Sequence, residues 1–380
     1  MGKFANFCIL TNPADSLNSY FLMKGYLSLE GVGLIAARFF GWNGSCVGEI
    51  AHYKAPYFTP QILTDPSYLG KIIVVDVENI EGRWPMPEES QSFMPHLAGL
   101  VFLGHVTDPA GAGEHFTLCN YLNMNRIPAL LPDDPHGMLQ AAKSTRGLFC
   151  AIDRDADRAE SRLKSGAKPL DFHSIASPQE YIWDLASGDM PEESINLVVW
   201  DHGVNNGLLR ALRKIGARLR VVPPYTEPER IIALHPDGVV IAGGPYPAEP
   251  ESSLERIERI IGIRPVLSVG SGALLVTRSL GIPIEPLESP HYGAAITVSD
   301  TSGESIETYQ AHAFAPSRAG LEKAGCDITH INAADSTVEG FVCPDYDITA
   351  MMFTMTSEPV PEVLKEYVEG LQKKTIASSE

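Results

Sequence analysis

Residues 265–275 read PVLSVGSGALL, a short apolar run followed by Gly-Ser-Gly and the start of a helical pattern. Three similar units precede it, opening with NLVVWD (196–201), RLRVVP (218–223) and DGVVIAGGP (237–245), each followed by helical spacing of apolar residues. Four strand-then-helix units with short connections predict an α/β fold with a doubly wound, mostly parallel sheet. Ligands bind such sheets at the carboxyl ends of the strands, where GGP and VGSG lie.

The first part of the chain has a different pattern. Strand-like segments crowd early and helical patterns follow, which predicts a β-rich α+β domain over residues 1–152. The polar, Pro- and Ser-containing stretch 153–194 is expected to be a linker with one or two short helices. The sheet domain then covers 195–373, and residues 374–380 form a frayed tail. The early strand-like segments are FCIL, GVGLIAARFF, CVGEIAHY and KIIVVDV.

Composition narrows the class of partner. The chain has 380 residues, 44% of them hydrophobic, which is enough for two domains with cores of their own. Its net charge of −18 provides no basic surface for nucleic acid or anionic lipid. No stretch approaches the roughly 20 apolar residues that a membrane helix needs. A small molecule or a protein is therefore the expected partner.

Cysteine and histidine spacing argues against cofactors. No CxxC pair and no signal peptide are present, so we expect reduced thiols and a cytoplasmic location. The 11 histidines lack HExxH or other paired-ligand spacing, which predicts no metal site. The GGP segment lacks both nucleotide-binding glycine motifs, so no cofactor is expected. The six cysteines are Cys8, Cys46, Cys119, Cys150, Cys326 and Cys343.

A second stretch, CVGEIAHYKAPYFTPQILTDPSYLGKIIVV (46–75), carries a family resemblance. It resembles the small, glutaminase-type subunit of carbamoyl phosphate synthetase. Further similar segments follow in the family's order, from about residue 20 to about residue 370. The resemblance implies that subunit's amino-terminal domain followed by a class I glutamine amidotransferase domain. The further segments are DHGVNNGLLRALRKIGARLRVVP (201–223), PDGVVIAGGP (236–245), TYQAHAF (308–314) and TVEGF (337–341).

The resemblance also identifies positions where the family's catalytic residues are missing. In the family, a cysteine at the corner of G-x-C-x-G attacks the glutamine amide, and a histidine in a late HPE motif is its base. Aligned without gaps from Pro265, the cysteine position is Gly270. The family's F-S-V-Q-Y-H-P-E falls on residues 351–358, so the histidine becomes Thr356 while the carboxylate remains as Glu358. Glutamine hydrolysis is therefore expected to be lost.

The family's glutamine contacts are changed as well. The leucine and glutamine after the corner become Ser271 and Leu274, and the asparagine and second glycine of SQNHGF become Ala311 and Ala313. The second glycine of NGPG, whose backbone supports the oxyanion, becomes Tyr246. The former glutamine pocket would comprise Ser67, Gly244, Tyr246, Ser271, Leu274, Gln310, Ala311, His312, Ala313 and Phe314.

Simpler roles compete with catalytic ones at several of these positions. Ser271 as a replacement nucleophile is disfavoured against a serine that caps a helix start, because no neighbouring motif supplies a histidine. His312 is interpreted as a buried hydrogen-bonded histidine in preference to a base. Ser67 and Asp65, in a Pro-containing turn, are expected to serve the turn itself. Glu358 is expected to cap or flank the last helix.

Two functions remain open from the sequence. In the first, the chain is a structural or allosteric partner of a large ATP-grasp subunit that uses free ammonia to make a carbamoyl product. In the second, it is a free-standing binding or regulatory protein, or an enzyme of different chemistry, that reuses the altered pocket. A shared fold does not decide between them, because unrelated functions occupy the same folds.

Overall fold

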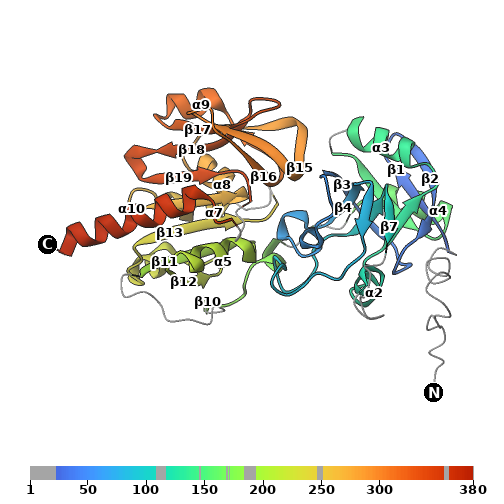
Figure 1. Cartoon of the computed structure of the whole chain (residues 1–380), viewed down its shortest axis with the longest axis horizontal. Helices are drawn as coiled ribbons and strands as arrows, with labels where there is room; N and C mark the ends of the chain where they lie inside the picture. The colour runs from blue at the N-terminus through green and yellow to red at the C-terminus, as the bar shows by residue number, and fades with distance from the viewer. Residues whose placement is uncertain are drawn as a thin grey trace, which may run out of the picture. The chain divides into compact units, whose positions relative to one another are not determined.

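The computed structural model describes most of the chain (Figure 1). The predicted strand FCIL at residues 7–10 lies outside the described residues. Within the described part, no helix combines the length and the apolar character that a bilayer crossing requires. The described residues are 23–107, 117–144, 147–167, 170, 172–183, 194–245, 251–354 and 359–379.

The chain forms two compact units that do not follow simple sequence order. The first unit contains residues 1–60, 70–85 and 97–169, and the second contains 61–69, 86–96 and 170–380. The stretch expected as a linker is divided between the two at residue 169. Two short segments from the amino-terminal part, 61–69 and 86–96, thus belong to the second unit.

The strands of the first unit pair in a closed ring, in the order β1-β2-β8-β6-β4-β3-β9 and back to β1. The pairs among β3, β4, β6 and β8 are parallel and the others antiparallel. Side chains such as Leu27, Val74 and Leu130 fill the interior and are fully buried. The strands are β1 (Lys24–Leu29), β2 (Gly33–Phe39), β3 (Cys46–Lys54), β4 (Lys71–Asp76), β6 (Gly99–Phe102), β8 (Ala129–Pro132) and β9 (Phe149–Asp153).

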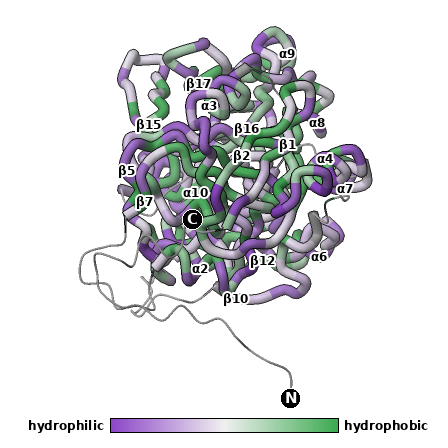
Figure 2. Tube along the Cα trace, turned by 90° about the vertical axis from the view of Figure 1, so that its right-hand side faces the viewer, coloured by the Kyte–Doolittle hydropathy of each residue, from purple (hydrophilic) through white to green (hydrophobic). Residues whose placement is uncertain are grey.

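Short helices and a two-stranded ribbon complete the first unit. Helix α4 (Ala156–Ser165) begins where Asp155 accepts a hydrogen bond from the backbone of Arg158, a typical N-cap. Most residues of α4 are hydrophilic, and Ala159 is buried (Figure 2). The other elements are α2 (Leu118–Met124), α3 (Pro135–Ser144), β5 (Asn79–Glu81) and β7 (His105–Thr107).

The second unit contains the predicted doubly wound sheet, which confirms the α/β fold class. Its parallel strands lie in the order β12-β11-β13-β14-β19, and β10 pairs antiparallel with β12 at one edge. Beyond β19 the sheet continues antiparallel through β18, β17, β15 and β16, an extension not predicted. The strands are β10 (Tyr181–Trp183), β11 (Ile195–His202), β12 (Ala217–Val222), β13 (Gly238–Gly243), β14 (Val266–Gly270), β15 (Ile284–Asp300), β16 (Ser305–Pro316), β17 (Asp327–Asn332), β18 (Val338–Cys343) and β19 (Ile348–Met351).

Helices cover both faces of this sheet. Successive side chains of the central strands point to opposite faces, and those on either face are apolar. Leu197 and Val199 of β11 pack in a core with α5 and α10, whereas Val198 and Trp200 pack with α6, α7 and α8. Helix α10 continues to Ser379, so the tail predicted to fray is helical, because no Gly or Pro interrupts it after Gly370. The helices are α5 (Asn206–Lys214), α6 (Pro228–Ala233), α7 (Glu251–Glu258), α8 (Ser271–Ser279), α9 (Arg318–Lys323) and α10 (Glu362–Ser379).

One expectation about the cysteines is wrong. Cys326 and Cys343 form a disulfide, although all six cysteines were expected as thiols. The start of β17 and the end of β18 are antiparallel neighbours, with Asp327 opposite Val342, so the two cysteines lie across from one another with their Cα atoms 4.2 Å apart. Their separation of 17 residues gives no sign of this.

Candidate functional site

The corner between β14 and α8 keeps a sharp turn without a side chain. Gly270 has φ 61° and ψ −131°, a conformation that costs a residue with a Cβ of the order of 1–3 kcal/mol. A Cβ at Gly270 would lie 3.3 Å from the carbonyl oxygen of Gly243, whereas one at Gly272 would lie 2.1 Å from that of Ile241. Strand β14 therefore turns into α8 as at a nucleophile-bearing corner, and α8 starts in close contact with β13.

Ser271 and Leu274, the two predicted pocket residues of α8, have little exposure to solvent. Ser271 occupies the first turn of α8 and is 8% exposed. Leu274 is fully buried in the apolar core that also contains Ile241 and Ile257. The structure therefore places Leu274 among hydrocarbon side chains.

The turn at residues 65–68 lies beside the carboxyl end of β13. Asp65 is buried and accepts a hydrogen bond from the backbone of Ser67 at 2.9 Å, which holds the short helix Pro66–Tyr68. A Cβ at Gly244 would lie 3.2 Å from the carbonyl oxygen of Pro66, so Gly244 permits a close approach of the two segments. The structure thus brings the turn that contains Ser67 against Gly244, and Asp65 serves the turn.

Strand β16 divides the next group of predicted residues between its two faces. Its burial alternates, with Gln310 and His312 buried and Ala311 and Ala313 partly exposed. The hydroxyl of Tyr309 lies 3.1 Å from that of Tyr68. Because side chains two apart on a strand share a face, the two alanines lie on the side that meets the 65–68 turn.

The other face of β16 belongs to the interior. Phe314 packs against the apolar core around α8, and the Gln310 side chain donates to the hydroxyl of Thr308 at 3.0 Å. Three of the predicted site residues, Tyr246, Thr356 and Glu358, lie outside the described residues.

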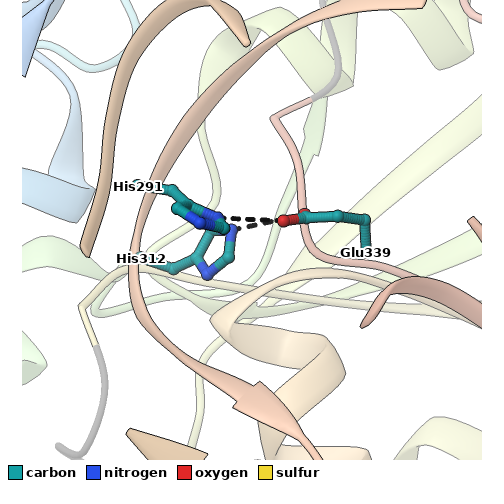
Figure 3. A group of neighbouring side chains, drawn as sticks. All are labelled: His291, His312 and Glu339. Carbon is teal, nitrogen blue, oxygen red and sulfur yellow. Dashed lines mark hydrogen bonds and ion pairs between the residues drawn. The ribbon is translucent and has the colours of Figure 1, made fainter. Parts of the chain in front are cut away.

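His312 belongs to a buried cluster with His291 and Glu339 (Figure 3). His291 on β15 is directly opposite His312 on β16, and their rings are 5.0 Å apart. Nδ1 of His291 lies 2.9 Å from Oε1 of Glu339, and Nε2 of His312 lies 3.4 Å from Oε2. Glu339, from β18, is fully buried.

The charges in this cluster depend on one another. Burial raises the pKa of Glu339, but the charge of His312 and the hydrogen bond to His291 outweigh it and hold that pKa below its ordinary value. Burial lowers the pKa of His291, and the hydrogen bonds and charges of Glu339 and Asp335 raise it above its ordinary value. Since a buried unpaired carboxylate is costly, the two histidines are what allow Glu339 to be charged there.

No local sequence motif indicates His291 or Glu339 as site residues. His291 lies in a strand interrupted by prolines and by register shifts, and Glu339 lies within TVEGF, which carried only the resemblance. Histidine spacing also gave no sign of the cluster, because its members come from three strands. Only the pairing of β15 with β16 places the two histidines opposite one another, and Glu339 comes from β18.

A buried carboxylate organises the carboxyl end of β11. Asp201 is 3% exposed and accepts three backbone hydrogen bonds, from Gly203 and Val204 at 2.8 Å and from Ser177 at 2.7 Å. The backbone of Gly244 in turn donates to the carbonyl of His202 at 3.0 Å. These bonds fix the loops that border the corner region.

The segment 86–96 supports the 65–68 turn. The Ser92 hydroxyl lies 2.7 Å from the carbonyl oxygen of Thr64, and Nε2 of His96 lies 2.9 Å from the same hydroxyl. Gln91 reaches the start of α5, where its side-chain oxygen accepts a hydrogen bond from Gly207 at 2.9 Å. The segment therefore connects the turn with the sheet unit.

His96 makes stability depend on pH. Burial lowers the pKa of His96 to about 4, whereas an unfolded histidine takes up its proton near 6.5. Between these values the unfolded chain binds more protons, so stability falls as pH falls. Between pH 7 and pH 4, we expect the wild type to lose about 2 kcal/mol more than His96→Gln, after allowance for the partial exposure of the ring. Urea unfolding at several pH values measures this, and parallel pH profiles would contradict it.

Comparison with known proteins agrees with this architecture. Residues 198–353 match the family model of class I glutamine amidotransferases, so the second unit contains a class I glutamine amidotransferase-type domain. The expected resemblance to carbamoyl phosphate synthase small chains is confirmed over most of the chain. The small chain of Syntrophotalea carbinolica is 27% identical over 84% of this chain and 89% of its own. That of Bacillus caldolyticus is 26% identical over 90% and 93%.

A solved structure of a glutamine amidotransferase from Thermotoga maritima also aligns with this chain. It covers 49% of this chain and 85% of its own, at 14% identity and a TM-score of 0.35. The similarity to the small chains, in contrast, extends through both units.

Proposed function

We propose that this chain is a non-hydrolysing small subunit, a structural or allosteric partner of a large ATP-grasp subunit of the carbamoyl phosphate synthase kind. Similarity to small chains along most of its length supports the pairing with a large subunit. In this proposal the large subunit activates bicarbonate with ATP and takes free ammonia. The chain itself supplies no ammonia.

The observation that carries the proposal is the corner at Gly270. An amide is a poor electrophile, so glutamine hydrolysis needs an activated nucleophile at a place where it can reach the carbonyl carbon. Gly270 keeps the turn, with φ 61°, and has no side chain. Ser271 follows in the first turn of α8 and is 8% exposed, and Leu274 is in the core. In this proposal neither Gly270 nor the enclosed Ser271 acts as a nucleophile, and Leu274 makes no contact with glutamine.

The first test is a pair of assays on the purified chain. We expect no release of ammonia from glutamine above background, for the wild type and for Gly270→Cys. The variant stays inactive because Thr356 does not supply a base and Leu274 does not contact an amide. Ammonia release that a thiol reagent abolishes in the wild type would contradict the loss of hydrolysis.

The second test measures the partnership. Bicarbonate-dependent ATP turnover of the host's large ATP-grasp subunit is followed with ammonium or with glutamine, each with and without this chain. We expect a several-fold stimulation with ammonium and none specific to glutamine. If the chain neither binds the large subunit nor changes its turnover, the partnership is wrong and a free-standing protein with an altered pocket is favoured.

A further inference from the structure

We propose that His291, His312 and Glu339 form a binding site for one divalent transition-metal ion, with Zn²⁺ the best match to the ligand set. Each of the three side chains offers one ligand atom, and these atoms lie within 4.8 Å of one another (Figure 3). The proposal does not depend on the proposed function, because Gly270 contributes no ligand to it.

The remaining ring nitrogens are already held by hydrogen-bond acceptors. Nε2 of His291 lies 2.9 Å from a carboxylate oxygen of Asp335, and Nδ1 of His312 lies 2.9 Å from the carbonyl oxygen of Phe314. A histidine that ligates a metal usually donates its other N–H to a carboxylate or a backbone carbonyl, which fixes the tautomer and the ring orientation. Both histidines of the cluster have this arrangement.

With His312 neutral, this arrangement leaves a lone pair on Nε2 of His312 facing the lone pairs of Oε2 of Glu339. A carbonyl only accepts, so the proton of neutral His312 is on Nδ1, and its Nε2 presents a lone pair to Glu339. Nε2 of His312 and Oε2 of Glu339 form no hydrogen bond with any residue that the structure describes, and they face one another at 3.4 Å, as an ion pair when His312 is protonated. Both residues are at least nine-tenths buried. A cation between these atoms would satisfy both.

The distances fit a small tetrahedral ion. Two ligands bonded to Zn²⁺ at about 2.0 Å are separated by about 3.3 Å in a tetrahedral site. Nδ1 of His291 lies 2.9 Å from Oε1 of Glu339, Nε2 of His312 lies 3.4 Å from Oε2, and one ligand atom from each of the three residues lies within 4.8 Å of the other two, so the side chains would close slightly around the ion. Two imidazoles and one carboxylate are a known zinc ligand set. The donor set also suits Fe²⁺, which makes metal identity an outcome of the test.

The ligands come from three different strands, so the ion would join them. His291 and His312 are directly opposite in the β15–β16 pair, and Glu339 lies on β18. The Asn332 side chain lies 3.5 Å from Glu339 and accepts a hydrogen bond from the backbone of Ala334, which further orders the carboxylate. Because the cluster is buried, the metal would stabilise the antiparallel extension of the sheet and not act on a substrate.

Metal content is measured first, on the full chain purified without a polyhistidine tag. We expect about one zinc per chain by elemental mass spectrometry after dialysis. Removal with a chelator lowers the melting temperature by several degrees, and Zn²⁺ restores it. Cobalt added to the stripped protein gives the visible absorption bands of a tetrahedral site. Absence of bound metal, together with no thermal or spectral response to Zn²⁺, Co²⁺ or Fe²⁺, would overturn the proposal and leave a protonated histidine network.

Variants separate metal binding from folding. Asp335 is partly exposed and orients His291, so Asp335→Ala should fold and weaken Zn²⁺ binding about 10- to 100-fold, with partial rescue by Asp335→Asn. Glu339→Gln, which keeps the shape of the side chain, should weaken Zn²⁺ binding more than Asp335→Ala does. His330→Gln, on neighbouring β17, is the matched control and should leave the affinity unchanged. Equal Zn²⁺ affinity in wild type, Asp335→Ala and Glu339→Gln would contradict the assigned ligands.

Discussion

Gly272→Ala is expected to lower the free energy of unfolding by more than about 3 kcal/mol, or to prevent the second unit from folding. A Cβ at this position would lie 2.1 Å from the carbonyl oxygen of Ile241 and 2.7 Å from its carbonyl carbon. Both are backbone atoms of a central strand, so the neighbour cannot rotate away. Overpacking in a core usually costs about 1–3 kcal/mol, and a clash between backbone segments lies at the upper end or beyond.

Urea unfolding, followed by circular dichroism, measures the effect of Gly272→Ala. Gly370→Ala is the matched control, because Gly370 lies within α10 and a Cβ added there would meet nothing within 4 Å. Alanine there should stabilise the chain by about 0.5–1 kcal/mol. If Gly272→Ala stays within 0.5 kcal/mol of the wild type, on the order of an ordinary surface substitution, α8 does not start against β13 as described.

Asp201→Ala should lower the free energy of unfolding by about 3–5 kcal/mol. The carboxylate accepts hydrogen bonds from Ser177, Gly203 and Val204, and its removal leaves three N–H groups without that acceptor. Each unsatisfied buried group costs about 1–3 kcal/mol, reduced where water enters the space. Because these loops border the Gly244 region, the loss should appear as unfolding of the whole second unit and not as local fraying.

Two controls test the assignment to Asp201. Asp201→Asn keeps one oxygen for Gly203 and Val204 but turns an amide toward Ser177, so it should cost less than alanine. Asp237→Ala removes the side-chain acceptor of the backbone N–H of Asn196, at the exposed start of the same strand. Its cost should be about 1 kcal/mol. Equal losses for Asp201→Ala and Asp237→Ala would show that burial of the three bonds is not the cause.

Local patterns predicted the parallel sheet well, for a physical reason. Strands such as β11 and β13 are covered on both faces, so they are short continuous apolar runs, and each is followed by a helix with apolar spacing. The corner at Gly270 was located from the same pattern. The backbone conformation that the structure gives it, with φ 61°, is one that glycine adopts readily.

Local sequence patterns did not predict which distant segments of the chain pack together. Strand β15 escaped prediction because register shifts at Pro286/His291 and Gly293/Ile296 break its period of two. The cluster of His291, His312 and Glu339 was not predicted, because its members come together only when β15, β16 and β18 are aligned. The family resemblance supplied Ser67 and Gly244 as neighbours, which no local pattern indicates.

The interleaving of the two units has a consequence for synthesis on the ribosome. Residues 61–69 and 86–96 emerge early, yet their packing partners in the second unit lie beyond residue 170. Gln91, for example, accepts hydrogen bonds from Gly207 through its side chain and from Asn206 through its backbone. Contacts of such high sequence separation slow folding. The early segments must therefore wait for more than a hundred residues of nascent chain, and a fragment that starts at residue 170 would lack them altogether.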